Sequence, residues 1–239
     1  MILEFFVTYY LIFTRPVSND NVVDLRPYFP KVFDQSTTNS CTAQAITAVA
    51  NYHERKMNKT SKLISRLDLY HQSRENTFVD GGATFEKSMN VIEHNGLCDE
   101  TLWPYSSGRV KSNPPKRCVN NRIVHTDLKP FRIPSNAQCI AYAVRNENPV
   151  IIGVLLTPSF SESDKTVPMT EPIIAKHAMV VVGVTENDER FVLRNSWSTK
   201  WKSNGHITVS RFFIDRYITN SWILTPLWIQ KMTIFKWIH

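Results

Sequence analysis

The sequence predicts an α+β protein with two lobes and a cleft between them. Apolar residues recur at helical spacing in the first part of the chain, whereas short β-branched runs separated by turn residues follow Pro149. A chain of 239 residues with 42% hydrophobic composition can bury a substantial core, as one domain or as two lobes that share a cleft. A helical half followed by a sheet-rich half is typical of the α+β class.

Four helices are expected, over residues 41–56, 65–75, 84–94 and from residue 135 to a point before Pro149. The first is a buried amphipathic helix whose first turn contains Cys41. Gly96 is well placed as the C-terminal stop of the third. Ser135 and Gln138 have the spacing of a capping box, which predicts where the fourth begins.

Four strands are expected over residues 150–156, 178–184, 191–193 and 207–209. The predicted division of the chain has an N-terminal apolar segment and connector, a mainly helical lobe that carries Cys41, a β-rich lobe that carries His177 and Asn195, and a C-terminal tail. These parts cover residues 1–21, 22–128, 129–225 and 226–239, respectively. The β-rich lobe is expected to be barrel-like.

The charge and the cysteines exclude two classes of function. The net charge is +7, yet the basic residues form no run of five or more, so we expect a solvated basic surface and no nucleic-acid partner. The four cysteines show no CxxC pair or His spacing of a zinc site, so no metal and no cofactor is expected. One cysteine lies in a setting that needs a free thiol. We therefore expect a reduced chain in an intracellular reducing compartment and do not expect a secreted protein.

Each end of the chain carries an apolar segment. Residues 2–13 lack a preceding Lys or Arg and are followed by Arg15, the opposite polarity to a secretory signal. The stretch is also shorter than the roughly 20 residues of a membrane-spanning helix. We interpret it as a packed strand or peripheral segment, with a degenerate signal as the alternative. The tail 228–239, rich in Ile, Trp and Lys, could dock onto a partner or contact a membrane surface weakly.

One set of residues predicts thiol chemistry. Cys41 begins a helix, whose positive N-terminal end favours a thiolate. Gln35 lies six residues upstream, where its amide and the Cys41 N–H could bind an oxyanion. His177 starts an apolar strand and Asn195 ends a returning one, so a hairpin would let the amide orient the imidazole. Taken singly, these residues also fit a core cysteine, a loop glutamine, a strand-end histidine and a turn asparagine.

In order and spacing, Gln35, Cys41, His177 and the Asn195–Trp197 run resemble the signature of papain-like cysteine proteases. The resemblance extends through the sequences VDLR, SRLDLY and LCDETLWPY, which begin at residues 23, 65 and 97, and covers the chain from about residue 22 to 224. It is closest to compact forms from bacteria and large DNA viruses that lack a full inhibitory propeptide.

The resemblance implies that Cys41 and His177 are the catalytic pair, that Asn195 orients His177, and that Gln35 contributes to the oxyanion hole. Trp197 would shield the hydrogen bond between Asn195 and His177. Trp201 would lie on the leaving-group side of the cleft, and Gly81 with Gly82 would bind substrate backbone. For both tryptophans, packing within the lobe is the alternative.

Several positions depart from the family pattern. The usual Cys-Gly-Ser-Cys-Trp is Thr38-Asn39-Ser40-Cys41-Thr42 here, so a cysteine that normally forms a nearby disulfide is missing. Ser198 and Lys202 replace glycines. Lys176 precedes the histidine, and its charge would oppose an imidazolium if it pointed into the site.

The resemblance implies a monomeric endopeptidase that takes an extended peptide or protein and forms a thioester on Cys41. If the source is viral, the host cytoplasm or the virion would be its location. The main alternative is a catalytically impaired member of the fold that binds peptide or protein partners. A transglutaminase-like or amidase enzyme would more often use an aspartate at the third position. A nucleic-acid-binding module would need clustered basic and aromatic residues.

Overall fold

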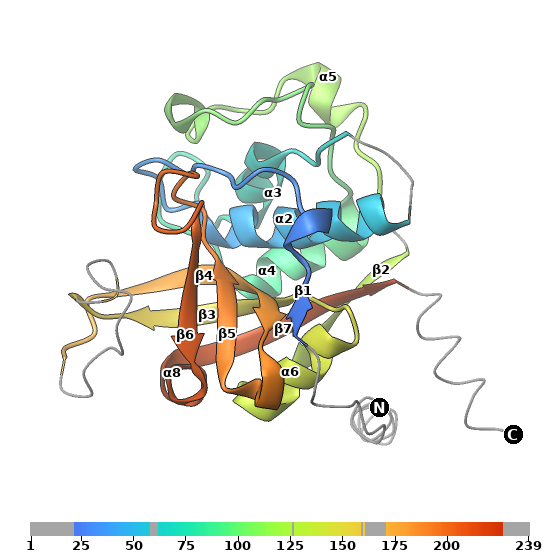
Figure 1. Cartoon of the computed structure of the whole chain (residues 1–239). Helices are drawn as coiled ribbons and strands as arrows, with labels where there is room; N and C mark the ends of the chain where they lie inside the picture. The colour runs from blue at the N-terminus through green and yellow to red at the C-terminus, as the bar shows by residue number, and fades with distance from the viewer. Residues whose placement is uncertain (1–21, 58–61, 126, 159, 161–170, 227–239) are drawn as a thin grey trace, which may run out of the picture.

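The computed structural model describes residues 22–57, 62–125, 127–158, 160 and 171–226. It has the predicted α+β architecture, with a helical lobe above an antiparallel sheet (Figure 1). The predictions for residues 2–13 and 228–239 lie outside the described residues. None of the helices in the described part of the chain is long and apolar enough to cross a membrane.

The helical lobe is built around a single long helix. Thirteen consecutive residues of α2, from Thr42 to Glu54, are buried, because the helix packs against α3 and α4 on one side and the sheet strand β4 on the other. The sequence predicts one buried face, whereas the two lobes together enclose the helix all round. The helical elements of the lobe are η1 (Arg26–Tyr28), α2 (Cys41–Lys56), α3 (Arg66–Ser73), α4 (Phe85–Asn90), η2 (Val91–Asn95), η3 (Ser107–Arg109) and α5 (Lys116–Val119).

Three predicted helices begin and end close to the expected positions. Ser65 and Thr84 cap α3 and α4 by accepting hydrogen bonds from backbone N–H groups. The third predicted helix is α4 followed by the π-helical turn η2, and Gly96 ends it with φ of 75°. At α6 (Ala137–Arg145) the predicted capping box is wrong, because the side chain of Asn136, not Ser135, accepts from the N–H of Cys139.

In the part of the chain that the structure describes, the sheet lobe contains the four predicted strands and three others. The strand order is β2-β7-β3-β4-β5-β6, all antiparallel, with β1 added to β4; within the described residues β2 and β6 are not paired, so the sheet is open. The strands are β1 (Val23–Asp24), β2 (Leu128–Ile133), β3 (Val150–Leu156), β4 (Ala175–Val184), β5 (Arg190–Arg194), β6 (His206–Ser210) and β7 (Ile218–Pro226). Helices α6 and α8 (Arg211–Tyr217) and the turn η4 (Glu186–Asp188) complete the lobe, with α6 and α8 on the side away from α2 (Figure 1).

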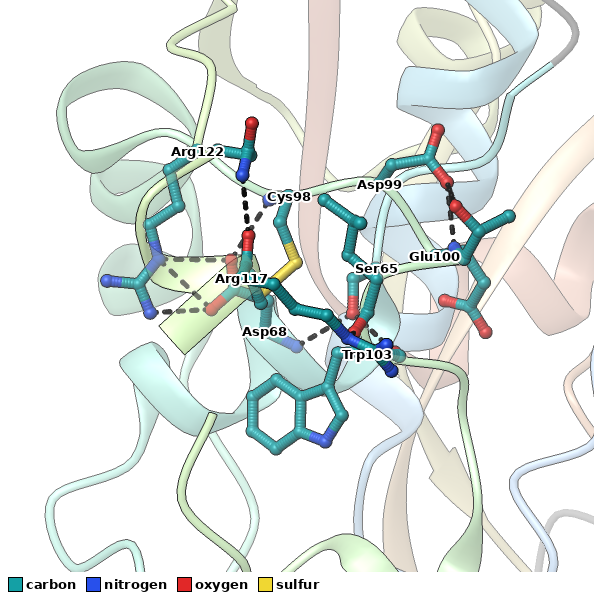
Figure 2. The surroundings of a disulfide bond; sticks show 12 residues. Ser65, Asp68, Cys98, Asp99, Glu100, Trp103, Arg117 and Arg122 are labelled. Carbon is teal, nitrogen blue, oxygen red and sulfur yellow. Dashed lines mark hydrogen bonds and ion pairs between the residues drawn. A yellow bond between two sulfur atoms is a disulfide. The ribbon is translucent and has the colours of Figure 1, made fainter. Parts of the chain in front are cut away.

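The prediction of a fully reduced chain is wrong. Cys98 and Cys118 form a disulfide with a Cα–Cα distance of 5.2 Å, although 20 residues separate them (Figure 2). Cys41 and Cys139 remain free thiols. The two bonded cysteines lie in a segment whose path no local pattern predicts, so only the tertiary fold brings them together. Cysteine usage therefore does not favour a reducing compartment.

Candidate active site

Three elements from different parts of the chain meet at one cavity of about 790 Å³. The first turn of α2 contributes Cys41, β4 contributes His177, and the segment before α4 contributes Gly81 and Gly82. The structure thus brings the predicted nucleophile, the predicted acid/base and the two predicted substrate-binding glycines to one cavity wall.

Cys41 is the first residue of α2, and the N-terminal end of that helix has no side-chain cap. Its sulfur is hydrogen-bonded by the backbone of Ala178, the residue after His177, and by Thr42. Burial raises the pKa of the Cys41 thiol, and these hydrogen bonds partly offset the effect. The thiol is therefore held beside β4 by backbone groups that also favour the thiolate.

His177 is paired with Asn195 as the predicted hairpin requires. His177 Nε2 lies 2.8 Å from Asn195 Oδ1, and the same oxygen accepts from the N–H of Ser196 at 2.7 Å. Strands β4 and β5 pair in antiparallel register with Val180 opposite Arg194, which brings the end of β5 to the start of β4. Because Nε2 donates to the amide oxygen, a neutral His177 carries its lone pair on Nδ1.

The side chain of His177 is largely shielded from solvent. Its side chain is buried, and burial lowers its pKa to about 4, while the hydrogen bond that His177 donates to Asn195 acts in the opposite direction. The ring of Trp197 lies over the imidazole, with 4.8 Å between ring centroids, and Trp201 packs edge-on against Trp197 at 5.4 Å. Trp197 thus covers the histidine, whereas Trp201 packs with Phe160 in the sheet lobe.

Gln35 lies beside the nucleophile loop, buried, and is fixed at both ends of its amide. Its Nε2 donates to the carbonyl of Thr38 at 2.7 Å, and its Oε1 accepts from the hydroxyl of Ser196 at 2.6 Å. Its backbone N–H also donates to the Ser196 carbonyl at 2.8 Å. The amide therefore joins the loop before Cys41 to the turn that carries Asn195.

The glycine segment is tied to the nucleophile loop through Asp80, a residue that sequence reasoning missed. Both carboxylate oxygens of Asp80 accept from the N–H of Asn39 at 3.1 Å, and Asn39 Nδ2 donates to the Asp80 carbonyl at 2.6 Å. Tyr70 also donates to Asp80 and accepts from the N–H of Gly82. Asp80 directly precedes the predicted Gly81–Gly82 pair, and that adjacency was the available signal.

The departures from the family pattern are accommodated locally. Ser198 and Lys202 have φ of 65° and 43°, the left-handed region that favours glycine, so the chain keeps a glycine-like backbone with other side chains. Lys176 is exposed at the cavity rim. Burial, and not the charge of Lys176, lowers the pKa of His177, so the proposed opposition between the two residues has no support in the structure.

A cluster of Asp68, Cys98 and Cys118 has atoms within 4.8 Å of one another, as in a metal site. However, the two sulfurs are bonded to each other, and the Asp68 carboxylate is bonded to Arg122 (Figure 2). The cluster therefore offers no free set of ligands and has a structural role.

The model of the papain family of cysteine proteases matches residues 20–222. An uncharacterized peptidase C1-like protein of Acanthamoeba polyphaga mimivirus is 30% identical, over 92% of this chain and 77% of that protein. A probable cysteine protease of Arabidopsis thaliana is 25% identical, over 77% of this chain but only 53% of its own length.

Solved structures agree on the fold. Xylellain, a cysteine protease from Xylella fastidiosa, superimposes with a TM-score of 0.80 at 21% identity, over 91% of this chain and 88% of that one. Bromelain from Ananas comosus, solved in complex with the E64 inhibitor, gives a TM-score of 0.68 at 20% identity, over 86% of this chain and 98% of that one. The expected likeness to compact viral and bacterial forms is confirmed, and the chain belongs to the papain family of cysteine proteases.

Proposed function

We propose that the protein is a cysteine-type endopeptidase in which Cys41 is the nucleophile, His177 the general acid/base and Asn195 the residue that orients His177. The observation that carries this proposal is the hydrogen bond of 2.8 Å from His177 Nε2 to Asn195 Oδ1 at a cavity that Cys41 also lines. This arrangement leaves Nδ1 as the nitrogen that can exchange a proton with the thiol.

In the proposed reaction, the Cys41 thiolate attacks the carbonyl carbon of an extended peptide while His177 holds the proton from the thiol. The carbonyl oxygen becomes an oxyanion, which the Gln35 amide and the Cys41 backbone N–H would stabilise. When the C–N bond breaks, the imidazolium gives its proton to the leaving amine and a thioester remains. His177 then takes a proton from water, which hydrolyses the thioester to a carboxylic acid and restores the thiol.

The electrostatics of the cavity favour the neutral pair, since burial raises the pKa of Cys41 and lowers that of His177. Each charged form can stabilise the other, because a thiolate and an imidazolium have opposite charges. Internal proton transfer from sulfur to Nδ1 changes no net charge, so the fraction of ion pair stays constant between the two macroscopic pKa values. The ring of Trp197 covers one face of the imidazole and keeps water from it, which strengthens the attraction within the pair.

The test is labelling with an epoxide inhibitor of papain-like enzymes, read by intact mass. Wild type, Cys41→Ala and His177→Ala are compared, and Cys139→Ala is the matched control because Cys139 is the other free, half-buried thiol. We expect one label on wild type and Cys139→Ala, and none on the other two variants. A label that persists in Cys41→Ala would place the reactive thiol elsewhere.

Hydrolysis of dye-labelled casein by the same four proteins tests the peptidase step. We expect loss of activity in Cys41→Ala and His177→Ala and full activity in Cys139→Ala. Folded wild type that takes no label and cleaves no casein would favour the alternative, a member of the fold that binds peptide without catalysis.

A further inference from the structure

Three hydroxyl groups form a largely buried cluster at the loop that precedes Cys41. Tyr105 OH lies 2.7 Å from Thr38 Oγ1 and 2.8 Å from Ser40 Oγ, and the latter two oxygens are 2.9 Å apart. Thr38 and Ser40 are buried, and Tyr105 is half-buried. The cluster therefore joins two residues of the loop before Cys41 to a residue more than 60 positions later in the chain.

The carbonyl of Gln35 completes the cluster. It accepts from Tyr105 OH and from Thr38 Oγ1, each at 2.9 Å. Three hydroxyl protons thus serve five oxygen–oxygen contacts, so the protons can be arranged in more than one way. Among the three hydroxyls, only that of Tyr105 comes from outside the loop of residues 35–40.

Tyr105 is itself held by partly buried ionic groups. Its N–H donates to Glu100 Oε1 at 2.9 Å, and Glu100 is paired with Arg66. The Arg66 guanidinium lies over the Tyr105 ring, 4.7 Å from its centroid. Arg66 also reaches Gln44, whose Nε2 donates to Ser40 Oγ at 3.1 Å, so the support returns to the residue before Cys41.

The cluster acts on the two groups that would bind the oxyanion. Gln35 carries one of them on its amide, and its backbone carbonyl is fixed by Tyr105. Ser40, the residue before the Cys41 N–H, is fixed by the same hydroxyl. A shift of the Tyr105 hydroxyl would move both groups together, whereas the sulfur of Cys41, besides contacting its own N–H, has partners outside the cluster in Ala178 and Thr42.

We propose that Tyr105 is a positioning residue for acyl transfer: its hydroxyl holds Gln35 and Ser40 in the relative positions that oxyanion binding needs. The inference rests on the proposed function. In this loop Thr38 occupies the position where the family resemblance implies a disulfide cysteine. The hydroxyl cluster would therefore stabilise a loop that lacks that disulfide.

The experiment separates the thiol from the oxyanion donors. Alkylation of Cys41 by iodoacetamide needs the thiolate but forms no oxyanion, whereas a peptide aldehyde binds as a hemithioacetal whose oxygen occupies the oxyanion position. In Tyr105→Phe we expect casein hydrolysis and aldehyde affinity to fall together by about tenfold, because two oxyanion donors lose their alignment. The rate of Cys41 alkylation should change by less than about twofold, because the sulfur keeps its own partners.

The matched control is Tyr52→Phe. Tyr52 is a buried tyrosine of α2 whose hydroxyl donates to the Glu147 carbonyl at 2.9 Å, remote from Cys41 in the helix. The Tyr52→Phe substitution removes the same kind of hydrogen bond and should leave casein hydrolysis, aldehyde affinity and the rate of Cys41 alkylation unchanged. Thr38→Val is a second variant of the cluster, for which we expect the same selective loss as in Tyr105→Phe.

Unchanged aldehyde affinity in both cluster variants would overturn the inference, as would a parallel fall in alkylation, which indicates general disruption. An equal loss in Tyr52→Phe would show that any lost tyrosine hydroxyl has this effect and would also overturn it. If wild-type Cys41 is not alkylated and casein is not cleaved, the proposed function itself fails and this inference fails with it.

Discussion

Side-chain crosslinks stabilise the segment of residues 97–125, whereas continuous main-chain pairing stabilises strands β3 and β4. The segment contains only η3, α5 and two isolated main-chain bridges, Leu97–Ile123 and Ile64–Asp99, yet it is fixed by the Cys98–Cys118 disulfide and by the ion pair of buried Asp68 with partly buried Arg122 (Figure 2). In contrast, β3 and β4 pair along seven residues of each strand and bury almost every side chain. A segment with little regular structure must satisfy its polar groups by specific long-range contacts.

The two regions should differ in the kind of substitution that destabilises them most. Loss of one member of a buried ionic pair leaves the other charge without compensation, which is costly. Loss of one methyl group from a sheet is spread over a large packed core, which costs little. Single polar changes in the helical lobe should therefore outweigh single apolar changes in the sheet.

The largest effect is expected at Asp68. Its carboxylate accepts from Arg122 and from the N–H of Cys98, and its side chain is fully buried. We expect Asp68→Ala to lower the free energy of unfolding by about 3–5 kcal/mol, measured by urea unfolding. The control is Asp24→Ala, which breaks the exposed pair with Arg26 and should cost less than about 1 kcal/mol. Similar losses in the two variants would contradict the comparison.

The disulfide should rank next. Removing the bond between Cys98 and Cys118 by a double change to serine is expected to lower the free energy of unfolding by about 3 kcal/mol, because the loop it closes is about 20 residues long. Cys139→Ser is the control, since Cys139 is a free thiol of α6. Equal unfolding midpoints for wild type and the double variant would show that ionic contacts alone fix the segment.

Acid should weaken the junction between the lobes. Burial lowers the pKa of His53, a residue of α2, to about 3, so the folded protein keeps it neutral while the unfolded chain binds a proton below about pH 6.5. Stability therefore falls as the pH drops below 6.5, by about 2–3 kcal/mol for this residue between pH 6.5 and 4.5.

His53→Asn should flatten that dependence, since the amide can retain a hydrogen bond to the Leu224 carbonyl without titrating. Urea unfolding at pH 7.0, 5.5 and 4.5 measures the slope for both proteins. His177 and His206, whose pKa values burial also lowers to about 4, should leave a residual slope in the variant. Identical slopes in the two proteins would rule out a contribution from His53.

A small effect is expected in the sheet. Ile151 of β3 is fully buried, and Ile151→Val should lower the free energy of unfolding by about 1 kcal/mol. The same change at Ile123, which is 68% exposed in the helical lobe, should be close to neutral. A loss at Ile151 as large as that of Asp68→Ala would remove the distinction between the two regions.

The smallest effect is expected at the site itself. Lys176 is exposed, and its charge does not set the pKa of His177. Lys176→Asn should leave the acid limb of the pH–rate profile in place, while Asn195→Ala should move it to lower pH, because the hydrogen bond that His177 donates to Asn195 raises the pKa of His177. A shift of the limb in Lys176→Asn would restore the interaction first expected from the sequence.

The sequence by itself determined the α+β class, helix α2, strands β3 to β6 and the candidate residues Gln35, Cys41, His177 and Asn195. Hydrophobic period is a local property, and the family signature lies in short runs around those residues, so both can be read without the fold. The roles of the candidate residues stay predictions. Strand β2 was missed because Pro130 interrupts it, which its place at the edge of the sheet tolerates, and β7 was missed because polar residues interrupt its apolar pattern.

Only the tertiary structure decided the contacts between distant parts of the chain. The pairing of Cys98 with Cys118, the ion pair of Asp68 with Arg122 and the place of Tyr105 behind the nucleophile loop each depend on the path of residues 97–125. That path has little periodicity of its own, because specific polar contacts, not a repeated apolar face, hold it. Such contacts form between atoms that meet only after distant segments of the helical lobe have packed, so no local pattern in the sequence encodes them.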